Sequence, residues 1–195
     1  MNEKHSIEYY EEELNNNPAL AESVLTNCDF SFDDTIDVEK DILNCGEKSN
    51  YTIHPFGKAG DGSSYVLLDN GYIAYISSDG ECGIVAKDVD EFFNIMLACK
   101  ALPHYFRKGV FDSIDSFEEK YDEVNKHTEN PEAIKTFIES QNLETDVEKL
   151  YKMFLAGLTT EPSLELQANP EEYAPWDDVF GTNQEYIKEL RNKMQ

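Results

Sequence analysis

The sequence predicts an α+β fold in which a central antiparallel or mixed sheet, a β-meander over about 51–86, is flanked by amino-terminal and several carboxy-terminal helices. Short β-rich runs between tight turns predict the meander. Apolar residues at helical spacing on both sides predict the helices. With 195 residues, the chain has the length of a single domain. Its expected parts are an acidic helical part (1–50), a meander-plus-helix core (51–102), and a helical part with a short final strand and tail (103–195).

Two helices are expected at the amino terminus. The first has Ile7, Tyr10 and Leu14 on one face, a spacing that gathers apolar side chains along a helix. The second begins with Asn17 as its cap and a proline in its first turn, because the asparagine oxygen accepts a backbone amide that has no partner in the helix. The connection over 27–50 shows a weaker pattern, and we predict a mixed, partly buried segment rich in aspartate.

The meander is predicted by β-rich runs separated by turn residues. Asn70 and Gly71 stand between two runs, and both tolerate the positive φ angles of a type I′ hairpin turn. A glycine-rich turn at Gly57, Gly60 and Gly62 separates another pair of runs. The expected strands cover 51–55, 64–68, 72–77 and 82–86.

The strand over 72–77 is apolar on both faces. Ile73 and Tyr75 alternate with Ala74 and Ile76, and successive side chains of a strand point to opposite faces. We therefore expect this strand near the centre of the sheet, covered on both sides.

Capping residues mark the expected helices that follow the meander. Asp88 and Glu91 resemble a capping box ahead of a helix that ends before Pro103. An apolar face over 114–124 predicts the next helix. A short final strand is expected over 163–167. The later helix starts are expected at Asn130 with Pro131, at Thr145 with Glu148, and at Thr182 with Glu185.

Charge is the strongest compositional feature. The chain has 40 acidic and 16 basic residues, a formal net charge of -24. Such a field repels nucleic acid and anionic membranes, whose binding requires clusters of Lys and Arg, so neither is an expected partner. It favours a basic protein partner, or serves solubility alone.

A cytoplasmic location is expected for this chain. Its first residues lack the apolar core of a signal peptide, and no run approaches the roughly 18 apolar residues of a membrane span. The cysteines have no metal-binding spacing, and a reducing compartment disfavours disulfides. We therefore expect free thiols at Cys28, Cys45, Cys82 and Cys99.

No motif indicates catalysis, a cofactor or a metal. The glycines of 57–62 precede a strand, whereas a phosphate-binding loop leads into a helix, so we expect a turn in which Asp61 binds backbone amides. The aspartates lack EF-hand spacing, and no serine or cysteine lies in a nucleophile motif. His54 and His104 are expected to be packed or exposed rather than general bases. A paired-carboxylate glycosidase stays open, although the small domain and single tryptophan disfavour it. We expect a protein that is not an enzyme.

The tail combines aromatic and acidic residues in a composition typical of protein interfaces. Tyr173 and Trp176 adjoin Asp177 and Asp178, which places aromatic anchors beside negative charge. The alternative is that Trp176 and Phe180 pack onto the core while the carboxylates are only solvated. Both interpretations stay open at the level of sequence.

Short motifs in the meander, the helix after it and the tail carry a family resemblance. They are GSSY (62–65), GYIAY (71–75), GECGIVA (80–86), VDEFF (89–93), SLEL (163–166) and YAPW (173–176). Together they resemble the SUKH superfamily, which includes fungal cell-wall glucan-synthesis regulators and many bacterial immunity proteins.

The resemblance implies a non-enzymatic domain that binds and neutralises a polymorphic toxin, often a nuclease. Because nucleases are commonly basic, the expected partner is a basic protein toxin domain, which the acidic field would attract. An intracellular scaffold of the glucan-synthesis-regulator kind is the alternative. The expected binding surface consists of amino-terminal acids and the tail, namely Asp33, Asp34, Asp37, Asp41, Tyr173, Trp176, Asp177 and Asp178.

Overall fold

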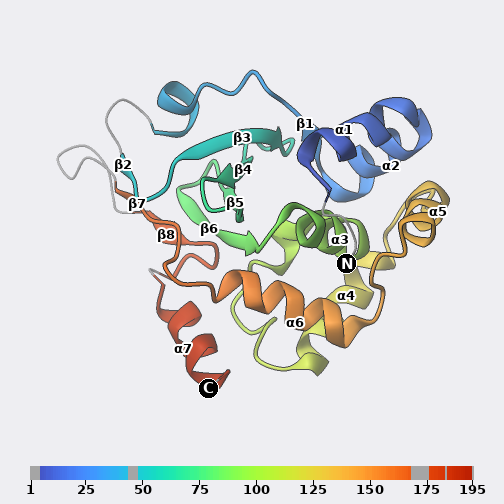
Figure 1. Ribbon diagram of the computed structural model, residues 1–195. Helices are drawn as coiled ribbons and strands as arrows, with labels where there is room; N and C mark the ends of the chain where they lie inside the picture. Colours follow the sequence, from blue (N-terminus) through green and yellow to red (C-terminus); the bar gives the residue numbers. More distant parts are fainter. Residues whose placement is uncertain (1–4, 44–47, 168–175, 183, 195) are drawn as a thin grey trace.

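A computed structural model describes residues 5–43, 48–167, 176–182 and 184–194, and it confirms the α+β class (Figure 1). A mixed six-stranded sheet has the order β1-β3-β4-β5-β6-β8, and only the pairing of β6 with β8 is parallel. A separate two-stranded sheet pairs β2 (Lys48–Ser49) with β7 (Leu166–Gln167). The strands of the main sheet are β1 (Ser31–Phe32), β3 (Ile53–Lys58), β4 (Ser64–Leu68), β5 (Ile73–Ile76), β6 (Glu81–Ala86) and β8 (Asp177–Asp178).

Helices gather on one side of the sheet, where α6 packs directly on β6, and α3 contacts both β6 and the helices α2, α4, α5 and α6 (Figure 1). All its side chains from Phe92 to Cys99 are buried, so it is the centre of the helical layer. The helical segments are α1 (Ile7–Asn16), α2 (Pro18–Cys28), the π-helical turn η1 (Val38–Ile42), α3 (Val89–Cys99), the 3-10 turn η2 (Leu102–Tyr105), α4 (Ile114–Asn125), α5 (Glu132–Gln141), α6 (Val147–Leu158) and α7 (Glu185–Lys193). None of the described helices is long and apolar enough to cross a membrane.

The sheet separates two apolar clusters, as the pattern of β5 predicts. Ile73 and Tyr75 belong to the large cluster beneath the helices. Ala74 and Ile76 belong to a smaller cluster on the other face, which also contains Ile42 of η1 and residues of 164–166. Among the described residues, the π-helical turn η1 and the segment 164–166 therefore contribute to the cover of the second face.

Helix α6 approaches the sheet closely because Gly157 has no side chain. A Cβ at this position would lie 2.4 Å from the carbonyl oxygen of Val85 in β6, closer than two such atoms pack. Gly157 thus fixes the distance between α6 and the sheet.

Two of the predicted helix caps are confirmed. The Asn17 side chain accepts the amide of Leu20 at 3.2 Å, and Asp88 accepts the amide of Glu91 at 2.8 Å. The Glu91 side chain in turn accepts the amide of Lys87, one residue before the cap, at 3.1 Å.

Three later helix starts were predicted at the wrong residue. Asn130 has a φ of 45°, and α5 starts after Pro131 without a side-chain cap. Glu144 accepts the amide of Thr145, which moves the cap of α6 to Asp146. Helix α7 starts at Glu185 with Gln184 at its cap position, and Thr182 accepts the amide of Tyr186 only at 3.4 Å.

The first and last predicted strands also shift. Strand β3 spans Ile53–Lys58 rather than 51–55, so Gly57 lies inside the strand and not in a turn. The pairing of β3 with β4 shifts its register between Pro55 and Gly57, which allows a proline and a glycine to lie inside a strand. The expected final strand over 163–167 shortens to β7, which pairs with β2 outside the main sheet.

Candidate functional site

The described residues form an acidic hollow with an apolar floor where α1 meets β1, β3 and β4. The hollow encloses about 260 Å³. Its lining includes four acidic residues, Glu8, Glu11, Asp33 and Asp34, together with His54. Its apolar part consists of Ile7, Phe32, Pro55, Phe56 and Leu67. We call this feature the acidic groove.

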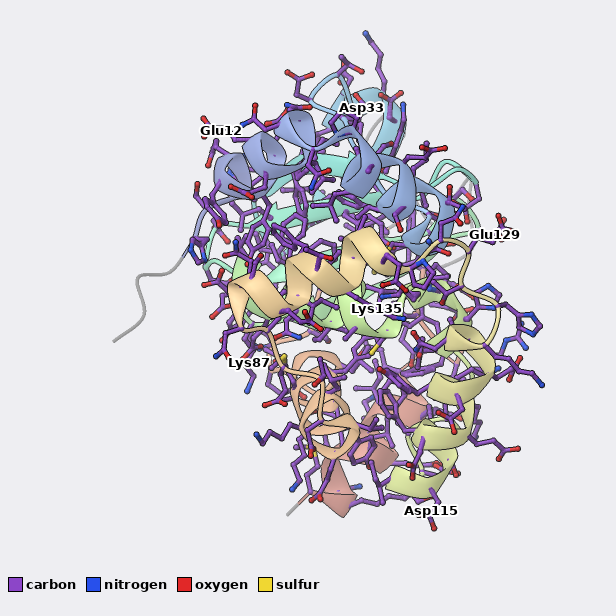
Figure 2. All side chains as sticks on the ribbon, turned by 90° about the vertical axis from the view of Figure 1, so that its right-hand side faces the viewer. Glu12, Asp33, Lys87, Asp115, Glu129 and Lys135 are labelled. Atoms are coloured by element: carbon purple, nitrogen blue, oxygen red, sulfur yellow. The ribbon has the colours of Figure 1, made fainter. Side chains whose placement is uncertain are left out.

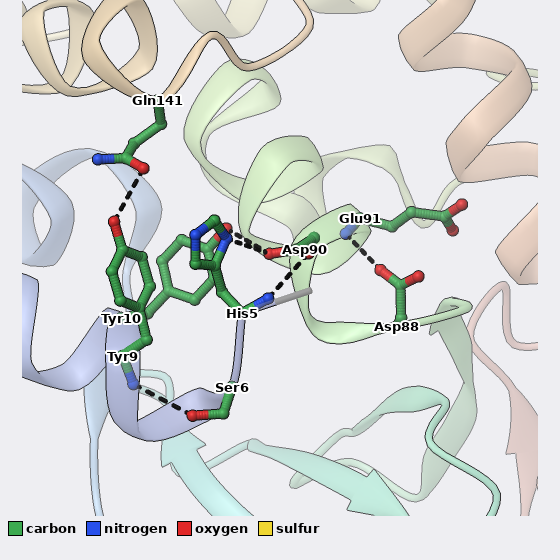
Figure 3. Close-up of polar contacts among 8 residues, drawn as sticks. All are labelled: His5, Ser6, Tyr9, Tyr10, Asp88, Asp90, Glu91 and Gln141. Atoms are coloured by element: carbon green, nitrogen blue, oxygen red, sulfur yellow. Dashed lines mark hydrogen bonds and ion pairs between the residues drawn. The ribbon is translucent and has the colours of Figure 1, made fainter. Parts of the chain in front are cut away.

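Helix α1, which supplies Glu8 and Glu11, is held against α3 and α5 by its tyrosines (Figure 3). The Tyr10 hydroxyl donates to Asp90 Oδ1 at 2.9 Å, and the Tyr10 ring stacks on Phe93 at 4.0 Å between centroids. The Tyr9 hydroxyl donates to Gln141 Oε1 at 2.8 Å. These bonds orient α1 so that its acidic residues face the end of the sheet.

The opposite wall depends on the close contact between Phe30 and Gly57. A Cβ at Gly57 would lie 2.4 Å from the Phe30 ring, so only glycine lets this ring lie flat on β3. Phe30 packs edge-on against Phe32 at 5.0 Å. This contact sets the position of Phe32 in the groove.

Asp33 is the most constrained carboxylate of the groove. It forms an ion pair with Lys58, and its Oδ1 accepts the hydroxyl of Thr35 at 2.6 Å and the amide of Thr35 at 2.9 Å. These bonds, first that of Lys58, lower the pKa of Asp33 to about 2 because each favours the ionised form. Asp33 therefore stays charged at any physiological pH, and its side chain is 11% exposed.

The other rim carboxylates have more capacity to bind a partner. Glu11 and Asp34 make no hydrogen bond or ion pair within the part of the chain that the structure describes. Asp34 is exposed, and Glu11 is half-buried. Asp33 and Glu12 lie at the end of the molecule formed by α1 and α2 (Figure 2), so the groove opens on a surface with further acidic side chains.

Asp37 and Asp41 bind within their own turn. The Asp37 amide donates to Asp41 Oδ2 at 2.8 Å, and the Lys40 ammonium lies 3.2 Å from Asp37 Oδ2. They do not line the acidic groove. Both side chains are exposed and help to form the π-helical turn η1.

The predicted tail residues lie away from the groove. Strand β8, with Asp177 and Asp178, is at the edge of the sheet opposite β1. Trp176 is partly buried against the second apolar cluster, and Phe180 is buried in the first, as the alternative interpretation of the tail expects. Tyr173 lies outside the described residues.

The Asp178 side chain is buried and accepts hydrogen bonds from neighbouring residues. It is 2% exposed, and its carboxylate accepts the amide of Phe180 at 2.8 Å and the hydroxyl of Thr182 at 2.7 Å. The described residues that were predicted to form one binding surface thus lie in three separate places, namely the acidic groove, the turn η1 and the region of β8. Of these residues, only Asp33 and Asp34 line the groove.

Sequence reasoning missed the α1 side of the groove. The spacing of Glu8 and Glu11 places both on one turn of a helix, which is a usable signal. The groove also requires α1 to lie near β1, the strand that precedes Asp33. These segments are separated in the sequence, and no local sequence pattern predicts that they meet.

The described residues contain no group of three or more His, Cys, Asp or Glu side chains arranged to hold a metal ion. The turn residue Asp61 accepts the amide of Ser63 at 2.8 Å, as predicted. Cys28, Cys82 and Cys99 are free, buried thiols, also as predicted, and Cys45 lies outside the described residues.

Comparison of the chain with protein-family models, curated proteins and solved structures finds no match. The functional argument therefore rests on the geometry and charge of the acidic groove.

Proposed function

We propose that this protein is a non-enzymatic binding domain that captures a basic protein in the acidic groove, and that it acts as an immunity protein against a cationic toxin domain. The observation that carries this proposal is that four acidic residues and five apolar residues line the same hollow. A lysine or arginine side chain matches such a site, because its methylene stem packs on apolar surface while its charged end pairs with carboxylates.

The free carboxylates support this proposal energetically. Glu11 and Asp34 make no hydrogen bond or ion pair with described residues that a basic partner would have to break. Binding therefore only replaces the water molecules around their carboxylates with a cationic group. The net charge of -24 would also accelerate the encounter with a basic partner. The SUKH resemblance of the meander supplies the biological setting, namely capture of a toxin.

The test is rescue of growth. Cells that express the protein encoded directly upstream are expected to stop growing, and co-expression of this chain is expected to restore growth. The purified pair should form a complex whose affinity falls as salt rises, because salt screens exposed charges. An upstream product that neither inhibits growth nor binds this chain contradicts the immunity role.

The double variant Glu11→Lys/Asp34→Lys is expected to weaken binding of that partner about 100-fold at low salt, since like charges facing each other cost several kcal/mol. Isothermal titration calorimetry at two salt concentrations measures this effect. The matched control is Glu118→Lys/Glu119→Lys, which changes the net charge equally. Both control residues are exposed on α4, the helix of Asp115 at the opposite end of the molecule (Figure 2). Equal loss in both variants would show that the groove is not the binding site.

A further inference from the structure

Lys100 has an unusual position directly after α3. Its backbone has φ 66° and ψ -148°, a conformation that is populated almost only by glycine. The residue is nevertheless a lysine and is only 6% exposed. Strained backbone of this kind occurs preferentially at functional sites, which directs attention to the Lys100 side chain.

The Lys100 amine is buried without a carboxylate partner. Its Nζ donates to the carbonyl oxygen of Leu97, and none of the ion pairs among the described residues includes it. Burial raises the pKa values of Cys28 and Cys99 to about 12, so both neighbouring thiols are neutral and provide no counter-charge. Burial, with a contribution from the charge of Lys135, lowers the pKa of Lys100.

Two adjoining hollows meet at Lys100. The larger, about 330 Å³, has an apolar part that includes Ala98, Tyr121 and Ile138, with Lys135 also lining it. Figure 2 marks Lys135 on α5. Lys100 and Thr128 line both hollows. The Thr128 hydroxyl is buried and has no hydrogen-bond partner in the described chain. It can therefore form a hydrogen bond with a ligand in the hollows that Lys100 also lines.

The smaller hollow, about 200 Å³, supplies groups that transfer protons. His104 and His127 line it together with Glu123. The Glu123 carboxylate lies 2.5 Å from the ammonium of Lys120 and so pairs with that residue instead of Lys100. Lys100 lines both hollows, and burial lowers the pKa of its amine, which favours the neutral form that acts as a nucleophile.

We propose that Lys100 forms a reversible imine with a small aldehyde or ketone whose apolar body occupies the larger hollow. This site is separate from the acidic groove and does not depend on the toxin-binding proposal. The lone pair of Nζ adds to the carbonyl carbon, and the amine proton moves to the oxygen to give a carbinolamine. Loss of that oxygen as water, with a proton delivered by His104 or His127, leaves a protonated C=N bond, and return of the N–H proton to the same imidazole gives the neutral imine. The step consumes no oxidant or reductant.

The test uses benzaldehyde as the probe, with cyanoborohydride to reduce any imine to a stable amine. The folded protein is treated at neutral pH, and the rate of labelling at each lysine is measured by peptide mass spectrometry. Lys100 is expected to be labelled at least about tenfold faster than the exposed Lys40 and Lys188, because a larger fraction of its amine is neutral. The advantage is expected to disappear in urea, where burial is lost. Labelling of Lys100 at or below the rate of Lys188 in the folded protein would overturn the proposal.

The variant Lys100→Met tests the environment of the amine. It keeps an unbranched side chain that is one atom shorter and removes the nucleophile, so labelling at this position must vanish while the fold remains. The folded state releases the Lys100 proton at lower pH than the unfolded state, whose ordinary pKa is 10.5. The parent protein is therefore expected to gain stability relative to Lys100→Met as pH rises towards 10.5. Thermal unfolding of both proteins between neutral pH and pH 10 measures this difference, and a constant difference would contradict a lowered pKa of Lys100.

Discussion

Phe92→Ala is expected to lower the free energy of unfolding by about 3 to 5 kcal/mol, the range found when a buried phenylalanine is reduced to alanine. Phe92 is fully buried in α3. Its ring centroid lies 5.2 Å from that of Tyr65 in β4 and 5.6 Å from that of Phe56 in β3. It also lies 6.0 Å from the Phe30 ring centroid. Removing this ring leaves a cavity between the central helix and the sheet, and urea denaturation measures the loss.

The control for this prediction is Phe92→Leu, which keeps most of the buried volume and is expected to cost less than the alanine variant. Because Phe56 lies in the acidic groove, Phe92→Ala is also expected to weaken partner binding. A loss below about 1 kcal/mol in the alanine variant would mean that the aromatic cluster does not support the fold.

Asp178→Ala is expected to destabilise the protein by about 3 to 4 kcal/mol. The variant removes bonds from a charged acceptor to the amide of Phe180 and the hydroxyl of Thr182, and hydrogen bonds to charged groups contribute about 1.5 to 3 kcal/mol each. It also leaves a buried amide without a partner. Thr182 in turn accepts the amide of Tyr186 at 3.4 Å, so the start of α7 is expected to loosen.

This prediction separates a structural role from a binding role for Asp178. Asp178→Asn keeps one oxygen acceptor in the same place and is expected to lose less stability than the alanine variant. Chemical denaturation and partner affinity are measured on both proteins. If Asp178→Ala unfolds at the parent's denaturant concentration but binds the partner less tightly, the carboxylate belongs to the interface and its structural assignment is wrong.

Local sequence signals predicted much of the fold because they act between residues close in the chain. A turn forms at Asn70-Gly71 as predicted, and the carbonyl of Tyr72 after it accepts the amide of Leu68 at 2.8 Å. The predicted type I′ geometry is wrong, because Gly71 has a φ of 90° but Asn70 does not have a positive φ. The caps at Asn17 and Asp88 bind amides three residues away. Each of these depends on a few neighbouring residues, and tertiary contacts did not displace them.

The wrongly predicted helix starts show where tertiary contacts, rather than local sequence, determine the first residue of a helix. Asn130 has the side chain of a good cap, but its carbonyl accepts the hydroxyl of Ser23 in α2 at 3.3 Å. The amide of Glu129 donates to Asn27 at 2.8 Å. These contacts tie the loop before α5 to α2 and place Asn130 at positive φ, so the cap cannot form.

The candidate site follows the same division. The acidity of 1–50 and the burial of the meander can be recognised from the sequence. The groove requires α1 to lie against β1 and β3, which depends on Tyr10 reaching Asp90 and on Phe30 covering Gly57. Lys100 becomes a candidate site only through its burial and backbone conformation, neither of which its neighbours in the sequence indicate.

The sequence by itself determined the α+β class, the central two-faced strand, the hairpin turn, two helix caps and the strongly acidic field. Those features depend on periodicity, turn chemistry and composition, which are properties of short segments or of the whole chain. The tertiary structure alone decided that Asp178 is an internal hydrogen-bond acceptor, that Asp33 and Asp34 share a groove with α1, and that Lys100 is buried. Those outcomes depend on contacts between distant segments, whose geometry is fixed only when the core packs.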